Sequence, residues 1–263
     1  VYNDRLKYIS NFSGSYGFAL ILKNKNYLFV DGRYTLQANK QSGRFFKIIT
    51  FPNKLPKDIL KNRKIRIGFD PKLFTNKILD VFFVNKNSKY VPIKVNLVDK
   101  IWQRKIKINK NKFFILPHQS VGASFKSKIK KISSNLRKKR ADYQFITACE
   151  NSAWLLNIRG RDTEYSPIPN CFILIDKNRN IQLFCDLKKI TKSLKKKFNK
   201  LKFINIKSIE RTLSKINKKK FIIDKNSCSQ MYENIIAKNN KILNLSDPIY
   251  FFKSIKKKIE IDN

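Results

Sequence analysis

The chain has 263 residues, of which 42% are hydrophobic and 21 are Phe, so it can build one large core or two ordinary ones. This composition argues against a disordered chain. No apolar run approaches the ~18 residues needed to cross a bilayer, and the first residues do not read as a signal peptide, so we expect no membrane association.

The formal net charge of +40 is extreme. One interpretation is a stand-alone basic protein that binds nucleic acid or an acidic partner, because dense lysine neutralises phosphate. The other is a bias in composition, since the excess is Lys rather than Arg and accompanies many Asn and Ile. The lysines are also spread from Lys7 to Lys258. We favour the compositional interpretation and expect no specific nucleic acid partner.

The sulfur and imidazole ligands are sparse. Cys149, Cys171, Cys185 and Cys228 form no Cys-x-x-Cys pair, and His118 is the only histidine. A zinc site needs about four N or S ligands at close spacing, so the sequence predicts none. Buried free thiols in a reducing cytoplasm are the simplest interpretation.

The first half opens with a glycine-containing turn that includes Gly14 and Gly17 and runs into an apolar segment, 18–22. Loops that cradle phosphate normally run from a strand into a helix, so we interpret this one as a tight turn that needs glycine torsions. Strands are predicted over 18–22 and 27–31, then a helix over 34–41 in which Leu36 packs inward. A strand over 65–70, a helix over 73–83 and a strand over 91–97 follow.

The segment Asp31, Gly32 and Arg33 lies at the first strand-to-helix junction. A catalytic Asp would need a partner base, and none is visible. We therefore expect Asp31 to cap the helix through its carboxylate and Arg33 to form an ion pair nearby.

The second half repeats this order. A helix over 124–139 and a strand over 143–147 precede strands at 172–176 and 181–186, and a helix over 187–198 follows. The pattern closes with a strand at 221–224, a helix at 230–237 and a strand at 241–245. A last helix is expected over 253–261. The boundary between the halves should fall within 103–125.

Matched order over five elements indicates a duplication into two α/β domains, each a mixed sheet with flanking helices. The first domain is placed at 1–110, the second at 120–248, and the start of a connector at 249–263. Only the second half begins with a helix and a strand before its hairpin, so we expect roughly 30 residues to be missing from the first half.

The segment 152–160 ends a helix and leads into a charged loop. Trp154 is expected to pack into the core, and Gly160 to follow the helix end because glycine tolerates positive φ. The loop that follows is expected to contact a substrate or another domain. Its candidate contact residues are Asn157, Arg159, Arg161 and Asp162. For Arg159, such a contact and a local ion pair stay equally open.

Two segments, 11–38 and 152–169, resemble in order the N-terminal half of aminopeptidase P, the Xaa-Pro aminopeptidases. Further matches lie at 68–71 and 96–102. The resemblance is to the long, three-domain form, in which two creatinase-like, ribonuclease H-like domains precede a catalytic "pita-bread" domain. It implies that this chain is a non-catalytic N-terminal portion whose partner is that catalytic domain.

In that family the catalytic domain holds two divalent metals, usually manganese, and releases the first residue from peptides with proline second. The resemblance therefore implies no catalytic and no metal-binding residue in this chain, which would be inactive by itself. It also implies a cytoplasmic enzyme that can form a homodimer at full length.

Overall fold

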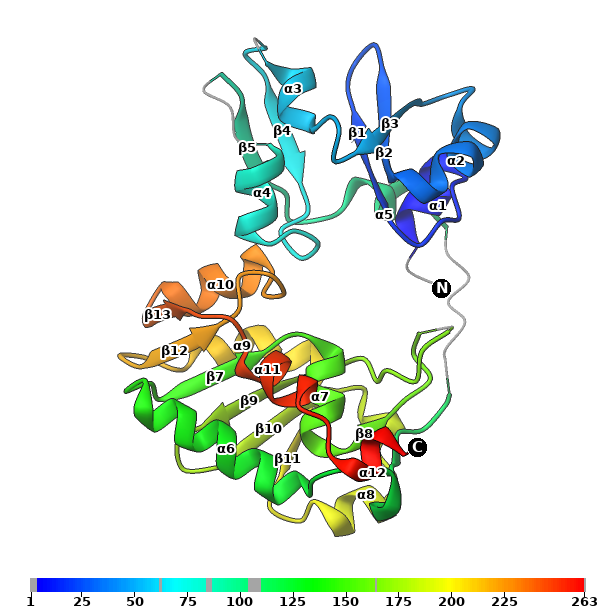
Figure 1. Ribbon diagram of the computed structural model, residues 1–263. Helices are drawn as coiled ribbons and strands as arrows, with labels where there is room; N and C mark the ends of the chain where they lie inside the picture. Colours follow the sequence, from blue (N-terminus) through cyan, green and yellow to red (C-terminus); the bar gives the residue numbers. More distant parts are fainter. Residues whose placement is uncertain (1–3, 62, 84–86, 104–109, 164, 263) are drawn as a thin grey trace. The chain divides into compact units, whose positions relative to one another are not determined.

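The computed structural model describes residues 4–61, 63–83, 87–103, 110–163 and 165–262. The chain divides into residues 1–107, here unit 1, and residues 108–263, here unit 2. In each unit, helices pack on strands that pair in both parallel and antiparallel directions (Figure 1). This is the α/β class with mixed sheets that the sequence predicts.

Unit 2 is built on strands and helices in alternation. Its strands are Phe114–Ile115 (β6), Tyr143–Ile146 (β7), Ile158–Arg159 (β8), Cys171–Asp176 (β9), Ile181–Cys185 (β10), Lys202–Asn205 (β11), Lys220–Ile223 (β12) and Lys241–Asn244 (β13). Its helices are Phe125–Lys138 (α6), Cys149–Leu156 (α7), Lys192–Lys197 (α8), Ile209–Ser214 (α9), Gln230–Ala237 (α10), Pro248–Ser254 (α11) and Lys258–Ile261 (α12), with 3₁₀ turns at His118–Ser120 (η2), Leu187–Lys189 (η3) and Ile206–Ser208 (η4).

The main sheet of unit 2 has six strands in the order β11-β10-β9-β7-β12-β13. Strand β7 is antiparallel to β9 on one edge and parallel to β12 on the other. The β9–β10 hairpin is thereby joined to the parallel pair β12–β13. Strands β6 and β8 form a separate short antiparallel pair.

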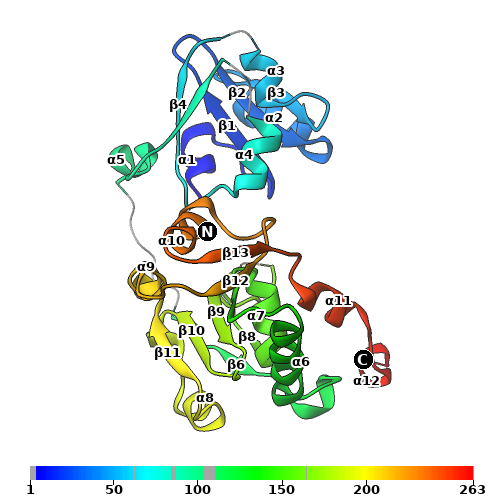
Figure 2. The ribbon, with the colours of Figure 1, turned by 90° about the vertical axis from the view of Figure 1, so that its left-hand side faces the viewer.

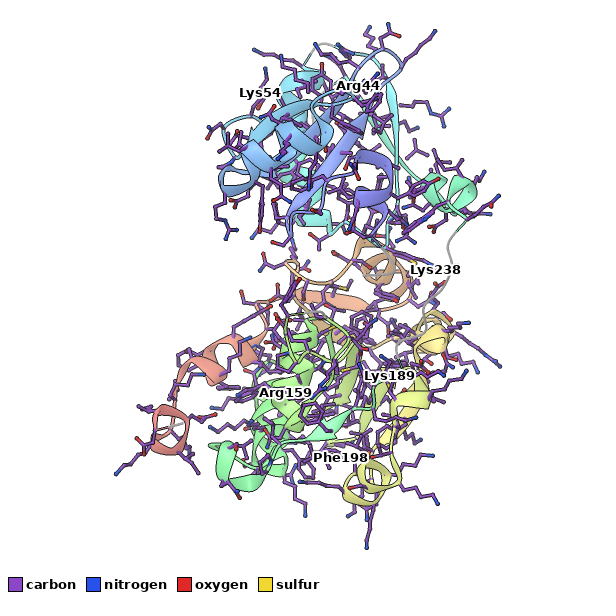
Figure 3. All side chains as sticks on the ribbon, turned by 90° about the vertical axis from the view of Figure 1, so that its right-hand side faces the viewer. Arg44, Lys54, Arg159, Lys189, Phe198 and Lys238 are labelled. Carbon is purple, nitrogen blue, oxygen red and sulfur yellow. The ribbon has the colours of Figure 1, made fainter. Side chains whose placement is uncertain are left out.

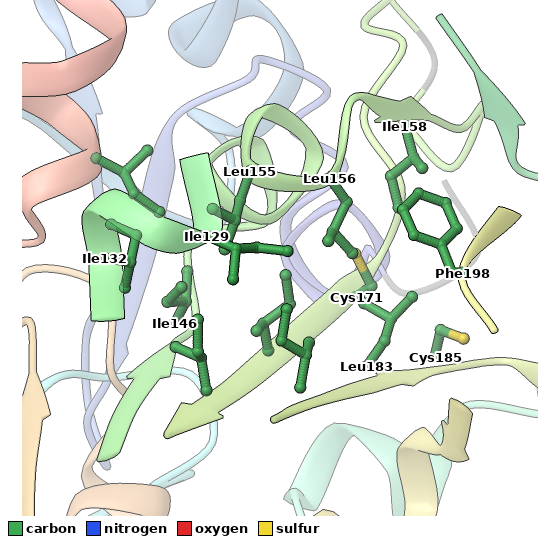
Figure 4. Close-up of a cluster of buried hydrophobic side chains, with 14 of the residues drawn as sticks. Ile129, Ile132, Ile146, Leu155, Leu156, Ile158, Cys171, Leu183, Cys185 and Phe198 are labelled. Atoms are coloured by element: carbon green, nitrogen blue, oxygen red, sulfur yellow. The ribbon is translucent and has the colours of Figure 1, made fainter. Parts of the chain in front are cut away.

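Two hydrophobic cores cover the two faces of this sheet. Because side chains alternate along a strand, Ile146 enters one core and its neighbour Phe145 the other. Helices α6, α7 and α11 contribute to the first core, and α9 and α10 to the second. Figure 2 shows these two sets of helices on opposite sides of the sheet. Figure 4 shows the first core, where residues such as Leu155 and Leu156 are at most 1% exposed.

Helix α6 shows why the sequence folds locally as it does. Ser124 caps its first turn by accepting a hydrogen bond from the N–H of Ser127. Ile129, Ile132 and Leu136 recur at helical spacing and form a buried stripe. Truncating such a residue to Ala costs about 2–5 kcal/mol, so this stripe fixes the helix on the sheet.

Unit 1 has the same kinds of element. Its strands are Gly17–Ile21 (β1), Asn26–Asp31 (β2), Lys47–Phe51 (β3), Arg66–Phe69 (β4) and Lys89–Pro92 (β5). Its helices are Arg5–Ser10 (α1), Thr35–Ser42 (α2), Pro56–Leu60 (α3), Asn76–Phe82 (α4) and Leu97–Ile101 (α5), with a 3₁₀ turn at Gly32–Tyr34 (η1).

The strands of unit 1 form two separate sheets, β1-β2-β3 and β4-β5. Leu28 and Val30 point to one face of the first sheet and pack with Phe12 and with Ala38 of α2. Phe29 points to the other face and packs with Leu60 of α3. Both faces of the β1-β2-β3 sheet are therefore covered by helices, as in unit 2.

The duplication predicted from the sequence is confirmed by the matching order of elements. The hairpin β1–β2 corresponds to β9–β10, the pair β4–β5 to β12–β13, and α4 to α10. Strand β3 pairs in parallel with β2 as β11 does with β10. Helix α1 corresponds to α7, because both end on an asparagine in the left-handed conformation, Asn11 and Asn157.

Several local predictions are wrong. The strand predicted over 91–97 lies at Lys89–Pro92 (β5) instead, and α5 already begins at Leu97. The last helix does not run over 253–261. Two short helices, α11 and α12, stand there instead, because Ile249 and the partly buried Phe252 dock into the core and draw the helix start back to Pro248. The helix predicted over 187–198 divides into η3 and α8 around Thr191, which caps α8. Leu36 does not pack inward: it is 87% exposed, because Ala38 and Ser42 form the buried side of α2.

Acidic side chains sit at the strand-to-helix junctions of both units. Asp31 caps η1 by accepting from the N–H of Arg33 and forms an ion pair with its guanidinium at 2.8 Å, as predicted. This pairing lowers the pKa of the Asp31 carboxyl. Asp186 caps η3 in the same way. After β4, Asp70 accepts from Asn96 at 3.0 Å, and after β12, Asp224 accepts from the N–H of Asp247 at 2.9 Å.

Asp247 accepts hydrogen bonds from three different residues. Its buried carboxylate accepts from the side chains of Gln144 and Asn151, at 2.9 and 2.8 Å, and from the N–H of Ile249 at 3.0 Å. Lys253 in turn donates to Asn151 at 2.8 Å. Burial raises the pKa of Asp247, while these donors oppose the rise. The network ties α11 to the central strand β7 and to α7.

Replacing Asp247 with Ala should lower the free energy of unfolding of unit 2 by at least about 2 kcal/mol, because a helix cap is lost and two buried amide donors lose their acceptor. The measurement is urea denaturation followed by Trp154 fluorescence in a Trp102→Phe background. Thr191→Ala is the matched control, since Thr191 caps α8 through one bond, to the N–H of Leu194. It should cost about 1 kcal/mol. Equal losses in the two variants would contradict the network's role.

Candidate contact site around Arg159

The site begins where α7 ends. Asn157 adopts φ 53° and ψ 36°, the left-handed conformation that asparagine tolerates better than most residues. Its side chain donates to the carbonyl of Ala123 at 2.9 Å, just before α6. This turn leads directly into β8, whose residue Arg159 lies opposite Phe114 of β6. A fixed turn and a short strand pair therefore position Arg159.

Glycine acts here through its size. Gly160 does not have a positive φ, contrary to the prediction, and Asn157 supplies the left-handed residue instead. A Cβ on Gly160 would lie 2.7 Å from the Cα of Pro169, so only glycine lets the two ends of the following loop approach. In unit 1, a Cβ on Gly14 would clash with the Cζ of the Phe12 ring, and one on Gly17 would lie 3.0 Å from the carbonyl oxygen of Phe29. The torsion-based interpretation of those two glycines is likewise wrong.

Lys128 of α6 lies under this turn and is only 3% exposed. Its ammonium donates to the carbonyl of Trp154 at 3.0 Å and to the side-chain oxygen of Asn157 at 2.5 Å. It also lies 4.0 Å from the centre of the Trp154 ring, a cation–π contact. Two oxygen acceptors and the face of an aromatic ring thus surround the ammonium. Trp154 packs against the core as predicted.

Burial lowers the pKa of Lys128 to about 8, and the positive charges of Arg159 and Lys256 act in the same direction. The carboxylate of Glu260, in α12, opposes this shift. The site therefore gathers positive charge from α6, β8 and the C-terminal segment, with one carboxylate nearby.

Arg159 is half-buried and contacts main-chain oxygens: the carbonyl of Ile158 at 2.9 Å and that of Ala153 at 3.5 Å. Burial lowers the pKa of its guanidinium. No carboxylate of the described residues forms an ion pair with it. Within that part of the chain, the local ion pair that the sequence left open is not formed, so the guanidinium keeps donors for a carboxylate or carbonyl of a partner.

The loop after Gly160 places its two charged residues differently. Asp162 points inward: it forms an ion pair with Lys189, whose side chain is 10% exposed, and accepts from the N–H of Asn170 at 2.8 Å. Arg161 is exposed and lines an open hollow with Thr163 and Tyr165. Figure 3 places Arg159 and Lys189 in unit 2. Asp162 therefore closes the loop, whereas Arg161 faces solvent.

Unit 1 repeats the backbone of this site without its charge. Asn11, Phe12, Ser13 and Gly14 occupy the positions of Asn157 to Gly160, and the glycine is again hemmed in by its neighbours. Ser13 stands where unit 2 has Arg159 and bonds the side chain of Gln41. The positive centre is thus particular to unit 2.

Sequence reasoning missed Lys128 and the buried Asp247. The signal for Lys128 was its place three residues after Phe125 and beside Ile129, in the apolar stripe of α6. A lysine at such a position is a candidate for burial with a carbonyl or aromatic partner. Asp247 carried no local signal, since its side-chain partners Gln144 and Asn151 lie about 100 residues away in sequence.

The described residues do not fit a metal centre. No group of three or more His, Cys, Asp or Glu side chains among them is placed to hold an ion. Lys and Arg, which dominate around Arg159, are not ligands for a divalent metal. The side chain of His118 lies outside the described atoms. Among the described residues, no helix has the length and apolar character of a membrane-spanning segment.

The buried ammonium should leave a signature in the pH dependence of stability. Lys128 titrates near 10.5 when unfolded and at about 8 when folded, so between these values the folded state holds fewer protons. The contribution of Lys128 to the free energy of unfolding therefore increases as pH rises through this window. We take the free energy of unfolding of the unaltered protein minus that of Lys128→Met, measured by urea denaturation. This difference should become more positive from pH 8 upward. Lys130→Met, on the exposed side of α6, should show a flat difference, and a flat difference for both would contradict the burial.

Comparison with known proteins agrees with the resemblance in the sequence. Residues 104–260 and residues 1–95 each match the creatinase/prolidase N-terminal domain. A probable Xaa-Pro aminopeptidase P of Laccaria bicolor is 31% identical over 98% of this chain and 42% of its own length. Xaa-Pro aminopeptidase 1 of Dictyostelium discoideum is 29% identical over 99% of this chain and 44% of its own.

A solved structure has the same fold. The X-prolyl aminopeptidase of Caenorhabditis elegans superposes with a TM-score of 0.86 at 23% identity, over 99% of this chain and 45% of that one. It is described as a cytosolic enzyme with a di-nuclear active site. This chain therefore spans less than half the length of these relatives. With two such domains in tandem, it belongs to the creatinase/prolidase N-terminal domain family.

Proposed function

We propose that residues 1–263 form the non-catalytic N-terminal portion of a metal-dependent Xaa-Pro aminopeptidase. The observation that carries this proposal is the alignment of nearly the whole chain, 98% and 99%, with relatives named Xaa-Pro aminopeptidases, of which it spans 42% and 44%. The substrate is a peptide with proline in the second position, and the partner is a catalytic domain outside this chain.

In this proposal the two metal ions, manganese, are held by that catalytic domain. The di-nuclear site of the Caenorhabditis elegans relative supports a pair of metals. When bound, such a pair supplies a hydroxide for attack on the peptide carbonyl. The cytosolic location of that relative supports a cytoplasmic enzyme, and a homodimer is part of the proposal for the full-length form.

The Arg159 site is the proposed contact between this portion and the rest of the enzyme or its substrate. A half-buried guanidinium bonded to carbonyls is held in place before any partner arrives. Such preorganisation reduces the entropy lost on binding, and a carboxylate partner would form a charge-assisted, two-pronged contact. Asn157 and Asp162 position the loop, and Arg161 extends its positive surface.

The chain alone, supplied with manganese and a peptide that begins Xaa-Pro, should show no turnover, because its described residues offer no site for a metal pair. A chain extended at its C-terminus to the length of the relatives should release the first residue. The measurements are liberated amino acid by chromatography and bound metal by mass spectrometry. Enzyme-like turnover by residues 1–263 would overturn the proposal.

In the extended enzyme, Arg159→Gln should reduce kcat/KM by about tenfold or more, the effect of losing about 1.4 kcal/mol of a charge-assisted contact. The free energy of unfolding of unit 2 should change little, because the substitution removes only hydrogen bonds from Arg159 to two main-chain carbonyls. Arg211→Gln, on the exposed surface of α9, is the matched control and should leave both quantities unchanged. Unaltered kinetics for Arg159→Gln would remove Arg159 from the contact.

A further inference from the structure

Unit 1 has a basic hollow with an exposed aromatic ring among its lining residues. The hollow has a volume of about 500 Å³ and lies between the β1–β2 turn and the loop from α2 to β3. Two segments line it, residues 23–26 and residues 43–47. They bring together four cationic side chains, which are those of Lys23, Lys25, Arg44 and Lys47. Arg44 lies at the surface of unit 1 (Figure 3).

The charge of the basic hollow is not compensated by carboxylates. None of its lining residues is acidic, and none of the four cations forms an ion pair within the part of the chain that the structure describes. A concave surface lined by one sign of charge concentrates its field and attracts counter-ions. The basic hollow therefore favours an anionic ligand that carries several charged groups.

Phe45 adds an aromatic surface to these charges. Its side chain is 70% exposed, whereas the neighbouring Phe46 is 6% exposed and packs in the core with Leu28. The N–H of Phe45 donates to the carbonyl of Ser42 at 3.0 Å, so the end of α2 fixes its backbone. The guanidinium of Arg44 lies over the ring, 5.5 Å from its centre. The ring is thus presented outward, with surface left for a second planar group.

Unit 2 repeats the basic turn but supplies its own carboxylate. Residues 23–26 read Lys-Asn-Lys-Asn, and residues 177–180 read Lys-Asn-Arg-Asn. The residue before each turn donates its N–H across it, so Leu22 of unit 1 corresponds to Asp176 of unit 2. The Asp176 carboxylate accepts two N–H bonds from its own turn, at 2.8 and 2.9 Å. Unit 1 has a leucine there, so its turn keeps an uncompensated charge.

The aromatic residue is also particular to unit 1. Strand β3 begins at Lys47, and its equivalent β11 begins at Lys202. Two residues before these, unit 1 has Phe45 and unit 2 has Lys200, and both positions are exposed. The two copies share a basic surface, but at this position only unit 1 adds a ring to it. The combination of ring and charge is therefore not a general consequence of the lysine-rich composition.

We propose that the basic hollow binds a nucleoside triphosphate, with its base stacked on Phe45 and its phosphates between the four cations. Every nucleobase has a face that can stack on an aromatic ring. Lysine and arginine side chains bind phosphate oxygens through charge-assisted hydrogen bonds. A triphosphate offers several charges within the span of one hollow, which matches four cations better than a single phosphate does.

The first test locates the ligand. Amide signals of the isotope-labelled chain are followed by NMR while ATP is added at physiological salt without magnesium. Signals of Asn24, Gly43 and Phe45 should shift and saturate with a common dissociation constant. Those of Asn178 and Lys200, at the matching surface of unit 2, should not saturate over the same range. Shifts that do not saturate in unit 1, or that are equal in the two units, would overturn the proposal.

The second test separates stacking from charge. Phe45→Ala should weaken ATP binding about tenfold and leave the binding of inorganic tripolyphosphate unchanged, because only ATP has a base to stack. Leu36→Ala is the matched control: it removes another exposed apolar side chain of unit 1, 87% exposed on α2, and should change neither affinity. Both substitutions lie at exposed positions, so the amide spectrum should keep the pattern of the folded chain. Equal losses for the two ligands, or no loss for ATP, would leave charge alone and overturn the proposal.

The third test examines the charges. Lys23→Gln combined with Lys25→Gln should weaken both ATP and tripolyphosphate by about tenfold or more. Lys195→Gln combined with Lys196→Gln, at exposed positions of α8, removes the same charge from unit 2 and should leave both affinities unchanged. Equal effects of the two pairs would mean that net charge, and not the basic hollow, holds the ligand, and would overturn the proposal.

A short oligothymidylate decides between a free nucleotide and a nucleotide within a strand. ATP should saturate the signals of unit 1 without any need for a strand. Binding of the oligothymidylate that depends on Phe45, in a chain whose signals ATP does not shift, would assign the basic hollow to single-stranded nucleic acid. That result would overturn the proposal of a free nucleoside triphosphate.

Discussion

The hydrogen bonds that β7 makes on both edges are the interaction on which unit 2 depends. One edge holds the antiparallel β9–β10 hairpin and the other holds the parallel pair β12–β13, and no other described strand joins these two pairs. Its side chains then divide between the cores, with Phe145 on one face and Ile146 on the other. Gln144, from the same strand, reaches the carboxylate that holds α11. Backbone pairing, core packing and attachment of the C-terminal segment therefore meet in four residues.

The predictable part of the fold is the part with a strong local pattern. Alternating apolar residues in β9 and β10 and the capped amphipathic α6 are visible in any short window of sequence. Strands β3 and β11 were not predicted. Both lie at the edge of their sheet, and Ile49 is the one buried residue in the two strands, so they carry little apolar pattern. The division of the last helix depends on the burial of Ile249, a long-range contact that no window contains.

The candidate site shows the same limit. Its loop and its charged residues were found from the sequence, because Asn157 and Gly160 mark a helix end. The contacts that shape the surroundings of Arg159 could not be predicted from the sequence. The burial of Lys128 depends on an interhelix contact, and the inward turn of Asp162 depends on Lys189, which follows 27 residues later. The two segments that carry the family resemblance, 11–38 and 152–169, contain the same structural position, once in each unit. Unit 2 has Arg159 at this position, whereas unit 1 has Ser13.

Carboxylates are the scarce component of this molecule, with 18 Asp and Glu against 58 Lys and Arg. Those described above are engaged in caps, in ion pairs or in the network around Asp247. Basic side chains, by contrast, radiate from both units (Figure 3). Attraction is thus concentrated in a few sites while mutual repulsion is spread over the surface. Higher ionic strength weakens the distributed repulsion more than these close, partly buried contacts, so the native state of this basic protein gains stability from added electrolyte.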